Sequence, residues 1–185
     1  MKKHSEKESD IEKLLRAIRF AAFKHKEQRR KDNVTPYINH PIAVAENLTN
    51  IGGVNDIDTI VAAILHDTIE DTRTTGDELE ESFGPLIRSI VEELTDDKNL
   101  PKKERKRLQI QHAPKASVQA KEVKLADKIA NVNDLMINPP EGWSRERKLE
   151  YVAWSEKVVA GVRGSNAKLE SHFDELCARV RSAED

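Results

Sequence analysis

The sequence predicts an all-helical protein, and three observations support this fold class. Apolar residues recur at spacings of three and four along nearly the whole chain, which is the period of one buried helix face. No run of alternating β-branched residues marks a strand. Every break between the periodic segments is short, so we expect residues 1–185 to form one domain with its core over about residues 10–180.

The first three helices follow from this periodicity. The first is expected over about residues 8–28, and the second begins at Pro41, since proline suits the first turn of a helix, and ends by Gly52. The third runs from about Asp56 to Glu70, and its continuous apolar stretch IDTIVAAIL indicates a central, buried position. The expected buried face of the first helix consists of Ile11, Leu14, Leu15, Ile18, Ala21 and Ala22.

The middle of the chain carries clear start and stop signals. Thr75 begins a capping box that opens a fourth helix, and Gly84 closes that helix. Pro85 then starts a fifth helix with a regular apolar face. The following segment 95–114 is polar, basic and interrupted by prolines, so we expect a loop and a short exposed helix.

The last third of the chain predicts three more helices. One covers about Ser117 to Met136, and the proline-rich segment 138–142 ends it. Ser144 is expected to cap the next helix, and Ser165 the last one, because serine side chains accept hydrogen bonds from free backbone N–H groups.

Bulk composition limits the classes of function. Charged residues make up 35% of the chain, yet the formal net charge is only −2, so most charges are expected on solvated helix faces. This balance argues against a nucleic-acid partner, which would need a net basic surface. No stretch is apolar and long enough for a signal peptide or a membrane span. The single cysteine, Cys177, excludes an internal disulfide, and we expect a cytoplasmic protein without a membrane partner.

Chemistry concentrates where the most hydrophobic helix ends. His66, Asp67, Glu70 and Asp71 follow the apolar stretch directly, and titratable groups at the end of a buried helix are costly unless they are compensated. A divalent cation is the simplest compensation. His66 and Asp67 can reach one ion, while Glu70 and Asp71 lie four residues further on and project from the same helix face. These two carboxylates are therefore expected to handle a catalytic water.

Two further residues can complete a metal site. His40 precedes a proline at a predicted helix start, and Asp127 lies inside the apolar segment VKLADKIANV, where a lone carboxylate would be unfavourable. Two histidines and two aspartates form a mixed nitrogen and oxygen set, which favours Mn²⁺ or a similar ion over a thiolate-type zinc site. Asn131 lies four residues after Asp127 and could hold a phosphate or orient a ligand.

Each residue also has a simpler interpretation. A His-Asp pair occurs by chance in many proteins, His40 could serve as a capping residue, and Asp127 could form a surface ion pair with Lys124 or Lys128. The order favours a shared site: a histidine, a His-Asp pair about 26 residues later, and an aspartate about 60 residues further on, each beside apolar neighbours.

This order resembles the HD-domain phosphohydrolase superfamily, and more closely the hydrolase domain of the RelA/SpoT enzymes. The nearest likeness is to the stand-alone small alarmone hydrolases, including the metazoan SpoT-like type, over roughly residues 10–180. The motifs that carry the resemblance are RRKD at 29–32, TPYINHP at 35–41, LHDTIEDT at 65–72, TDDK at 95–98, KLADK at 124–128 and PEGW at 140–143.

The resemblance implies a bundle of about ten helices and a Mn²⁺-dependent reaction. That reaction removes pyrophosphate from the ribose 3′ position of (p)ppGpp and leaves GDP or GTP, with Glu70 and Asp71 acting on the nucleophilic water. Nothing in the chain leaves room for the synthetase domain of the larger RelA/SpoT enzymes. The implied metal ligands are His40, His66, Asp67 and Asp127, and the implied substrate contacts are Arg30, Lys31, Lys102, Asn131 and Tyr151.

Several alternatives stay open at this stage. The adenine alarmone (p)ppApp is a possible substrate, because Ile129, Ala130 and Asn133 depart from the metazoan pattern beside the expected base pocket. A broader nucleotide phosphatase, such as one removing the 2′-phosphate of NADPH, and a silent nucleotide-binding module are the other candidates. Lys103 and Arg105 are expected on a solvated charged face, and the sequence does not predict the oligomeric state.

Overall fold

The computed structural model describes residues 8–183, and this part of the chain is helical with no β-strand, as the sequence predicted. A single isolated bridge, between Arg29 and Pro36, is the only β-type pairing in these residues. The helices are α1 (Asp10–Lys24), α2 (Asn39–Glu46), α3 (Ile57–Leu65), α4 (Thr68–Asp71), α5 (Gly76–Phe83), α6 (Pro85–Leu94), α7 (Lys102–His112), α8 (Val118–Ile137), α9 (Arg145–Ala160) and α10 (Ala167–Ser182), with the short π-helix η1 (Asn47–Ile51) and 3-10 turn η2 (Ala113–Lys115).

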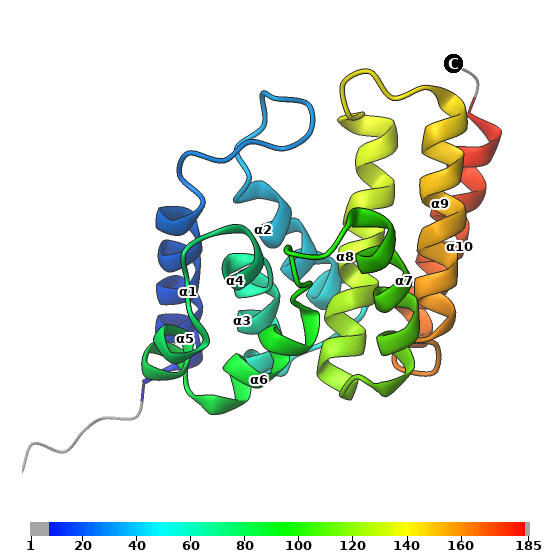
Figure 1. Cartoon of the computed structure of the whole chain (residues 1–185). Coiled ribbons are helices and arrows are strands. Elements are labelled where there is room, and N and C mark those ends of the chain that lie inside the picture. The colour runs from blue at the N-terminus through cyan, green and yellow to red at the C-terminus, as the bar shows by residue number, and fades with distance from the viewer. Residues whose placement is uncertain (1–7, 184–185) are drawn as a thin grey trace, which may run out of the picture.

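Helix α8 runs through the middle of the bundle. It packs against α2, α3 and α6 on one side and against α9 and α10 on the other. Figure 1 shows the resulting division, with α1 to α6 on one side of α8 and with α7, α9 and α10 on the other. Elements from both halves therefore meet along α8.

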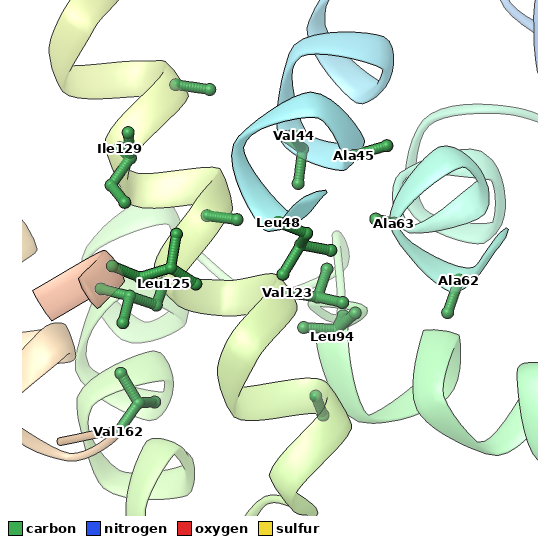
Figure 2. Packing of buried hydrophobic residues seen from close by; sticks show 14 of the residues in the cluster. Val44, Ala45, Leu48, Ala62, Ala63, Leu94, Val123, Leu125, Ile129 and Val162 are labelled. Carbon is green, nitrogen blue, oxygen red and sulfur yellow. The ribbon is translucent and has the colours of Figure 1, made fainter. Parts of the chain in front are cut away.

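The core surrounds this central helix. Figure 2 shows Val44 of α2 and Leu48 of η1 in one cluster with Val123 and Leu125 of α8, and all four are fully buried. Close-packed side chains of this kind hold the helices in a fixed relation to one another. The helices that carry the candidate ligands thus rest on a rigid base. No helix in the described range is both long and apolar enough to cross a membrane.

Most predicted helix starts are confirmed at the level of single hydrogen bonds. The side chains of Thr75, Ser117 and Ser144 each accept a bond from a backbone N–H of the first turn. The last helix differs, because Asn166 caps it, whereas the Ser165 hydroxyl donates to the carbonyl of Val162 at 2.8 Å. Both residue types are good caps, so the sequence alone did not separate them.

Helix α1 is shorter and less buried than expected. Ser9 caps it in a capping box with Glu12, and it ends at Lys24 instead of residue 28. Its buried residues are Ala17 and Ala21, which pack toward α3. Ile11 and Leu15, which the periodicity assigned to the buried face, are 72% and 61% exposed.

The expected third helix is interrupted where the candidate ligands lie. Helix α3 ends at Leu65, and α4 begins only at Thr68. At the break, the Thr68 hydroxyl donates to the carbonyl of Leu65 at 2.6 Å, and Nδ1 of His66 lies 2.8 Å from the carbonyl of Ala63. Side chains thus take carbonyl groups that a continuous helix would bond through its backbone. The break at His66 and Asp67 was not predicted.

Candidate active site

Four side chains from three segments converge at the centre of the molecule. His40 comes from α2, His66 and Asp67 from the break between α3 and α4, and Asp127 from α8. The Nε2 atom of His40 lies 3.1 Å from Oδ1 of Asp127 and 3.7 Å from Oδ2 of Asp67. The Nε2 atom of His66 lies 3.0 Å from Oδ2 of Asp67 and 3.9 Å from Oδ1 of Asp127. Donors bound to one ion at roughly 2.1 Å lie about 3 Å apart, so these spacings fit a shared divalent cation.

The environment of His66 supports this fit. Its Nδ1 faces the carbonyl of Ala63, which directs Nε2 toward the cluster. Nε2 is buried and has no hydrogen-bond partner among the described residues, since its contact with Asp67 is close but misaligned. Burial lowers the pKa of His66, but its contacts with Asp67, Asp127 and the carbonyl of Ala63 together outweigh burial and raise this pKa to about 9. The cluster therefore favours a positive charge at its centre, which either a proton or a metal ion can supply.

The candidate ligands are held in place by an outer layer of polar side chains. The Tyr37 hydroxyl donates to Oδ2 of Asp67 at 2.6 Å. Asn131 donates to Oδ1 of Asp127 at 2.6 Å, and the ammonium of Lys128 lies 2.9 Å from Oδ2 of the same residue. Burial lowers the pKa of Lys128, but Asp127, together with Tyr151 and Asp96, outweighs burial and raises this pKa above its ordinary value. Contacts of this kind orient ligands and tune their charge.

These contacts revise one alternative and add two residues. Asp127 does pair with Lys128, but the lysine is buried and the pair belongs to the site rather than to the surface. Sequence reasoning assigned no role to Tyr37 and gave Lys128 only as a possible surface partner of Asp127. Tyr37 lies three residues before His40, and Lys128 follows Asp127 directly. The signals in the sequence were this proximity to candidate ligands and the place of both residues in the motifs TPYINHP and KLADK.

Glu70 and Asp71 lie beside the four candidate ligands in different surroundings. Burial raises the pKa of Glu70 to about 7, although its Oε2 accepts a hydrogen bond from the backbone N–H of Asp96 at 3.0 Å. Asp71 accepts a hydrogen bond from Gln28 at 3.0 Å and also contacts the ammonium of Lys98. Glu70 can therefore exchange a proton near neutral pH, while Asp71 is compensated by a neighbouring cation.

All of these side chains line one pocket of about 490 Å³. Every residue expected to contact metal, water or substrate lies on its wall, including Arg30, Lys31, Lys102, Asn131 and Tyr151. The structure thus brings together residues that span positions 30 to 151 of the chain.

Arg30 is tied into the wall of this pocket by acceptors of its own. Its guanidinium donates to Asp134 at 2.7 Å and to Asn131 at 2.9 Å. Because Asn131 in turn donates to Asp127, Arg30 is linked to a candidate ligand through one intervening side chain. Arg30 therefore helps to position Asn131 as well as adding positive charge to the pocket.

One part of the pocket wall is aromatic, and cationic side chains lie beside the rings. Tyr151 packs against Trp143 and Trp154, with ring centroids 5.8 and 5.3 Å apart. The ammonium of Lys31 lies 5.6 Å from the Trp143 ring, and that of Lys106 lies 4.4 Å from the Trp154 ring. Flat rings beside cations suit a ligand that has both a heterocycle and phosphates. Sequence reasoning did not assign the two tryptophans to the site.

Arg105 was expected on a solvated face, and this expectation was wrong. Its side chain is only 26% exposed, lines the pocket and points its Nη1 atom at Glu70 over 3.7 Å. Its neighbour Lys103 is exposed, as expected. Because α7 has no fully buried residue, its sequence has no clear period that separates the face toward the pocket from the face toward solvent.

The pocket of this helical bundle holds a cluster of two histidines and two aspartates, which occur along the chain in the order His, His-Asp, Asp. This arrangement is typical of metal-dependent hydrolases. A profile of the HD domain matches residues 17–152, and the chain accordingly belongs to the HD-domain family.

Individual proteins that are similar to this chain have names that state a more specific activity than the family does. The chain is 56% identical over 169 residues to guanosine-3′,5′-bis(diphosphate) 3′-pyrophosphohydrolase MESH1 of Xenopus tropicalis, covering 91% of this chain and 94% of that protein. The human MESH1 protein is 55% identical over the same coverage. A solved structure, described as a metazoan ortholog of SpoT that hydrolyzes ppGpp and plays a role in starvation responses, matches with a TM-score of 0.88 and 46% identity over 96% of this chain and 99% of that one.

Proposed function

We propose that this chain is a single HD-type hydrolase domain that removes the 3′-pyrophosphate of ppGpp-type alarmones and requires Mn²⁺. The observation that supports this most directly is that one pocket combines three features. It contains histidine and aspartate side chains that could bind a metal, the carboxylic acid Glu70 with a pKa near 7, and many cationic side chains. The MESH1 relatives, which are similar over nearly their whole length, carry the same activity in their names.

The donor set supports a divalent metal cofactor. His40, His66, Asp67 and Asp127 would hold it, and their mixture of imidazole nitrogens and carboxylate oxygens suits Mn²⁺. When bound, the ion would supply Lewis acidity toward the phosphate and the attacking water. Tyr37 and Lys128 keep the two aspartates oriented and ionised.

The remaining residues bind the substrate and move the proton. Glu70 accepts a proton from the attacking water, whose oxygen bonds to the phosphorus next to the ribose. The bond from that phosphorus to the 3′-oxygen breaks, the 3′-oxygen takes up a proton, and pyrophosphate and GDP are the products. Asp71 fixes the water with Glu70. Arg30, Lys31, Lys102, Asn131 and Tyr151 hold the phosphates and the nucleoside in the pocket.

The test is a product analysis with purified, Mn²⁺-loaded protein. We expect release of pyrophosphate and GDP from ppGpp. Asp127→Ala should lose both metal and turnover, whereas Glu70→Gln should keep the metal and lose turnover by roughly 10²- to 10⁴-fold. Metal content is measured by elemental analysis of the same samples.

The same assay separates the alternatives. Parallel incubations with ppApp decide the base preference. Release of phosphate from NADPH without pyrophosphate from either alarmone would favour a broader nucleotide phosphatase. Binding of ppGpp without any turnover by metal-loaded protein would contradict the proposal and favour a silent nucleotide-binding module.

A further inference from the structure

Arg105 is a mostly buried cation of the pocket. Its side chain lies on α7 and is 26% exposed, and its Nε atom is buried without a hydrogen-bond partner among the described residues 8–183. Its Nη1 atom lies 3.7 Å from Oε1 of Glu70, which is an ion-pair contact but too long for a hydrogen bond. Withdrawing the Nε–H donor of a guanidinium from water without an acceptor is unfavourable. An anionic ligand in the pocket would supply such an acceptor.

Other cations of the same pocket already have partners. Arg30 donates to Asp134 and Asn131, Lys128 pairs with Asp127, and Lys98 contacts Asp71. Acceptors of the protein therefore already compensate part of the charge of these three groups, whereas Arg105 has no hydrogen-bonded acceptor for its Nε atom in the described part of the chain.

The nearby Arg107 provides a contrast on the same helix. It donates to Glu104 at 2.6 Å and to Gln111 at 3.0 Å, and it does not line the pocket. Its charge is satisfied at the surface of α7. Arg105 and Arg107 thus differ in surroundings although they share a helix and a residue type.

The position of Arg105 assigns it to one part of the substrate. If Glu70 takes the proton of the attacking water, that water lies within about 3 Å of its carboxylate, and the phosphorus under attack lies next to the water. The outer phosphate of a 3′-pyrophosphate is one bridging oxygen further away. A guanidinium 3.7 Å from Glu70 is close enough to reach it. Lys31 and Lys106 instead lie against the aromatic part of the pocket wall.

We propose that Arg105 binds the outer phosphate of the 3′-pyrophosphate and so makes the site select a pyrophosphate over a single phosphate. This inference rests on the proposed function. The planar fork of arginine can donate two parallel hydrogen bonds to phosphate oxygens, which a lysine cannot reproduce. Arg105 binds the phosphate through its N–H donors and takes no part in the proton transfer.

The experiment compares Arg105→Gln, Arg105→Lys and the matched control Arg107→Gln in the full, metal-loaded chain. Binding of inorganic pyrophosphate and of inorganic phosphate is measured by calorimetry, with metal kept in fixed excess in all solutions. We expect Arg105→Gln to weaken pyrophosphate binding by roughly 10-fold or more, the effect of one charge-assisted hydrogen bond, and to leave phosphate binding within about 2-fold. Arg105→Lys should be intermediate, and Arg107→Gln should behave as the wild type.

Turnover of ppGpp by the same variants provides the second readout. Arg105→Gln should raise KM by a factor similar to the loss of pyrophosphate affinity, with thermal unfolding unchanged. Unchanged pyrophosphate binding in Arg105→Gln, or an equal loss for phosphate and pyrophosphate, would overturn this inference while ppGpp hydrolysis by the wild type still stands. If Arg105→Gln selectively loses pyrophosphate binding but the wild type does not hydrolyse ppGpp, the proposed function alone is overturned.

Discussion

Glu70 combines a proposed catalytic position with surroundings that disfavour its charge. Its side chain is 18% exposed, and burial raises its pKa from 4.5 to about 7. Lys98 and Arg105 lie 3.9 and 3.7 Å from its Oε1 atom, too far to form hydrogen bonds that would stabilise the carboxylate. A carboxylate in this position is useful for moving a proton at neutral pH and unfavourable for folding.

The stability of the metal-free protein should therefore change with pH through Glu70. Between pH 4.5 and about 7 the folded protein holds a proton that the unfolded chain has released, so the contribution of Glu70 to stability is lost as pH rises through this window. Glu70→Gln has no charge to bury. Its stability relative to wild type should rise between pH 5 and pH 8, by up to about 3 kcal/mol.

Urea denaturation of both proteins in the presence of a chelator measures this difference. Glu104→Gln is the control, because the side chain of Glu104 is 40% exposed and its pKa is lowered by the hydrogen bond from Arg107, so this variant should show no such gain. If the difference in unfolding free energy between wild type and Glu70→Gln does not change with pH, the buried carboxylate of Glu70 does not destabilise the folded protein as expected.

At the scale of residues, the sequence predicted the groups with unusual chemistry and missed the groups that support them. His66, Asp67 and Asp127 stand out because burying a titratable side chain in an apolar segment is unfavourable unless a partner compensates it. Trp154 and Lys128 do not stand out, since a tryptophan or a lysine on a helix is common in any bundle. Their roles depend on contacts between α7, α8 and α9, which no local pattern records.

At the scale of elements, the break between α3 and α4 is the feature that places His66 and Asp67. Periodicity predicted one helix through this region because the spacing of apolar residues does not show which side chains form hydrogen bonds with backbone carbonyl groups. Thr68 is fully buried, and its hydroxyl donates to the carbonyl of Leu65. This hydrogen bond helps to end α3 where the ligands begin.

Thr68→Val should therefore weaken metal binding without touching a ligand. Valine keeps the shape but removes the hydroxyl, and we expect a loss of about 1 kcal/mol in stability and a roughly 10-fold weaker affinity for Mn²⁺. Thr49→Val is the matched control, because Thr49 also donates to a carbonyl three residues before it, that of Glu46, but in η1. Calorimetric titration with Mn²⁺ measures the affinities, and equal affinities in all three proteins would contradict this role of Thr68.

At the scale of the whole molecule, the four proposed ligands join parts of the chain that are far apart in sequence. Residues 40, 66–67 and 127 come from α2, from the α3–α4 break and from α8, which itself links the two halves of the bundle (Figure 1). An ion that binds only the folded arrangement stabilises the fold by mass action. The sequence predicted the helices individually, whereas their meeting along α8 is a property of the packed core shown in Figure 2.

Removal of metal should consequently lower the thermal stability of the entire domain. At a free Mn²⁺ concentration about 100-fold above its Kd, binding contributes about 2.7 kcal/mol, which corresponds to a Tm higher by roughly 5–10 °C for a domain of this size. Differential scanning calorimetry with Mn²⁺ or with a chelator measures the shift. Glu70→Gln should keep the full shift because it leaves the ligands in place, while Asp127→Ala should lose it. If Asp127→Ala keeps the shift, Mn²⁺ binds elsewhere on the protein, and if Glu70→Gln loses it, Glu70 is itself a ligand and the proposed division between metal binding and proton transfer is wrong.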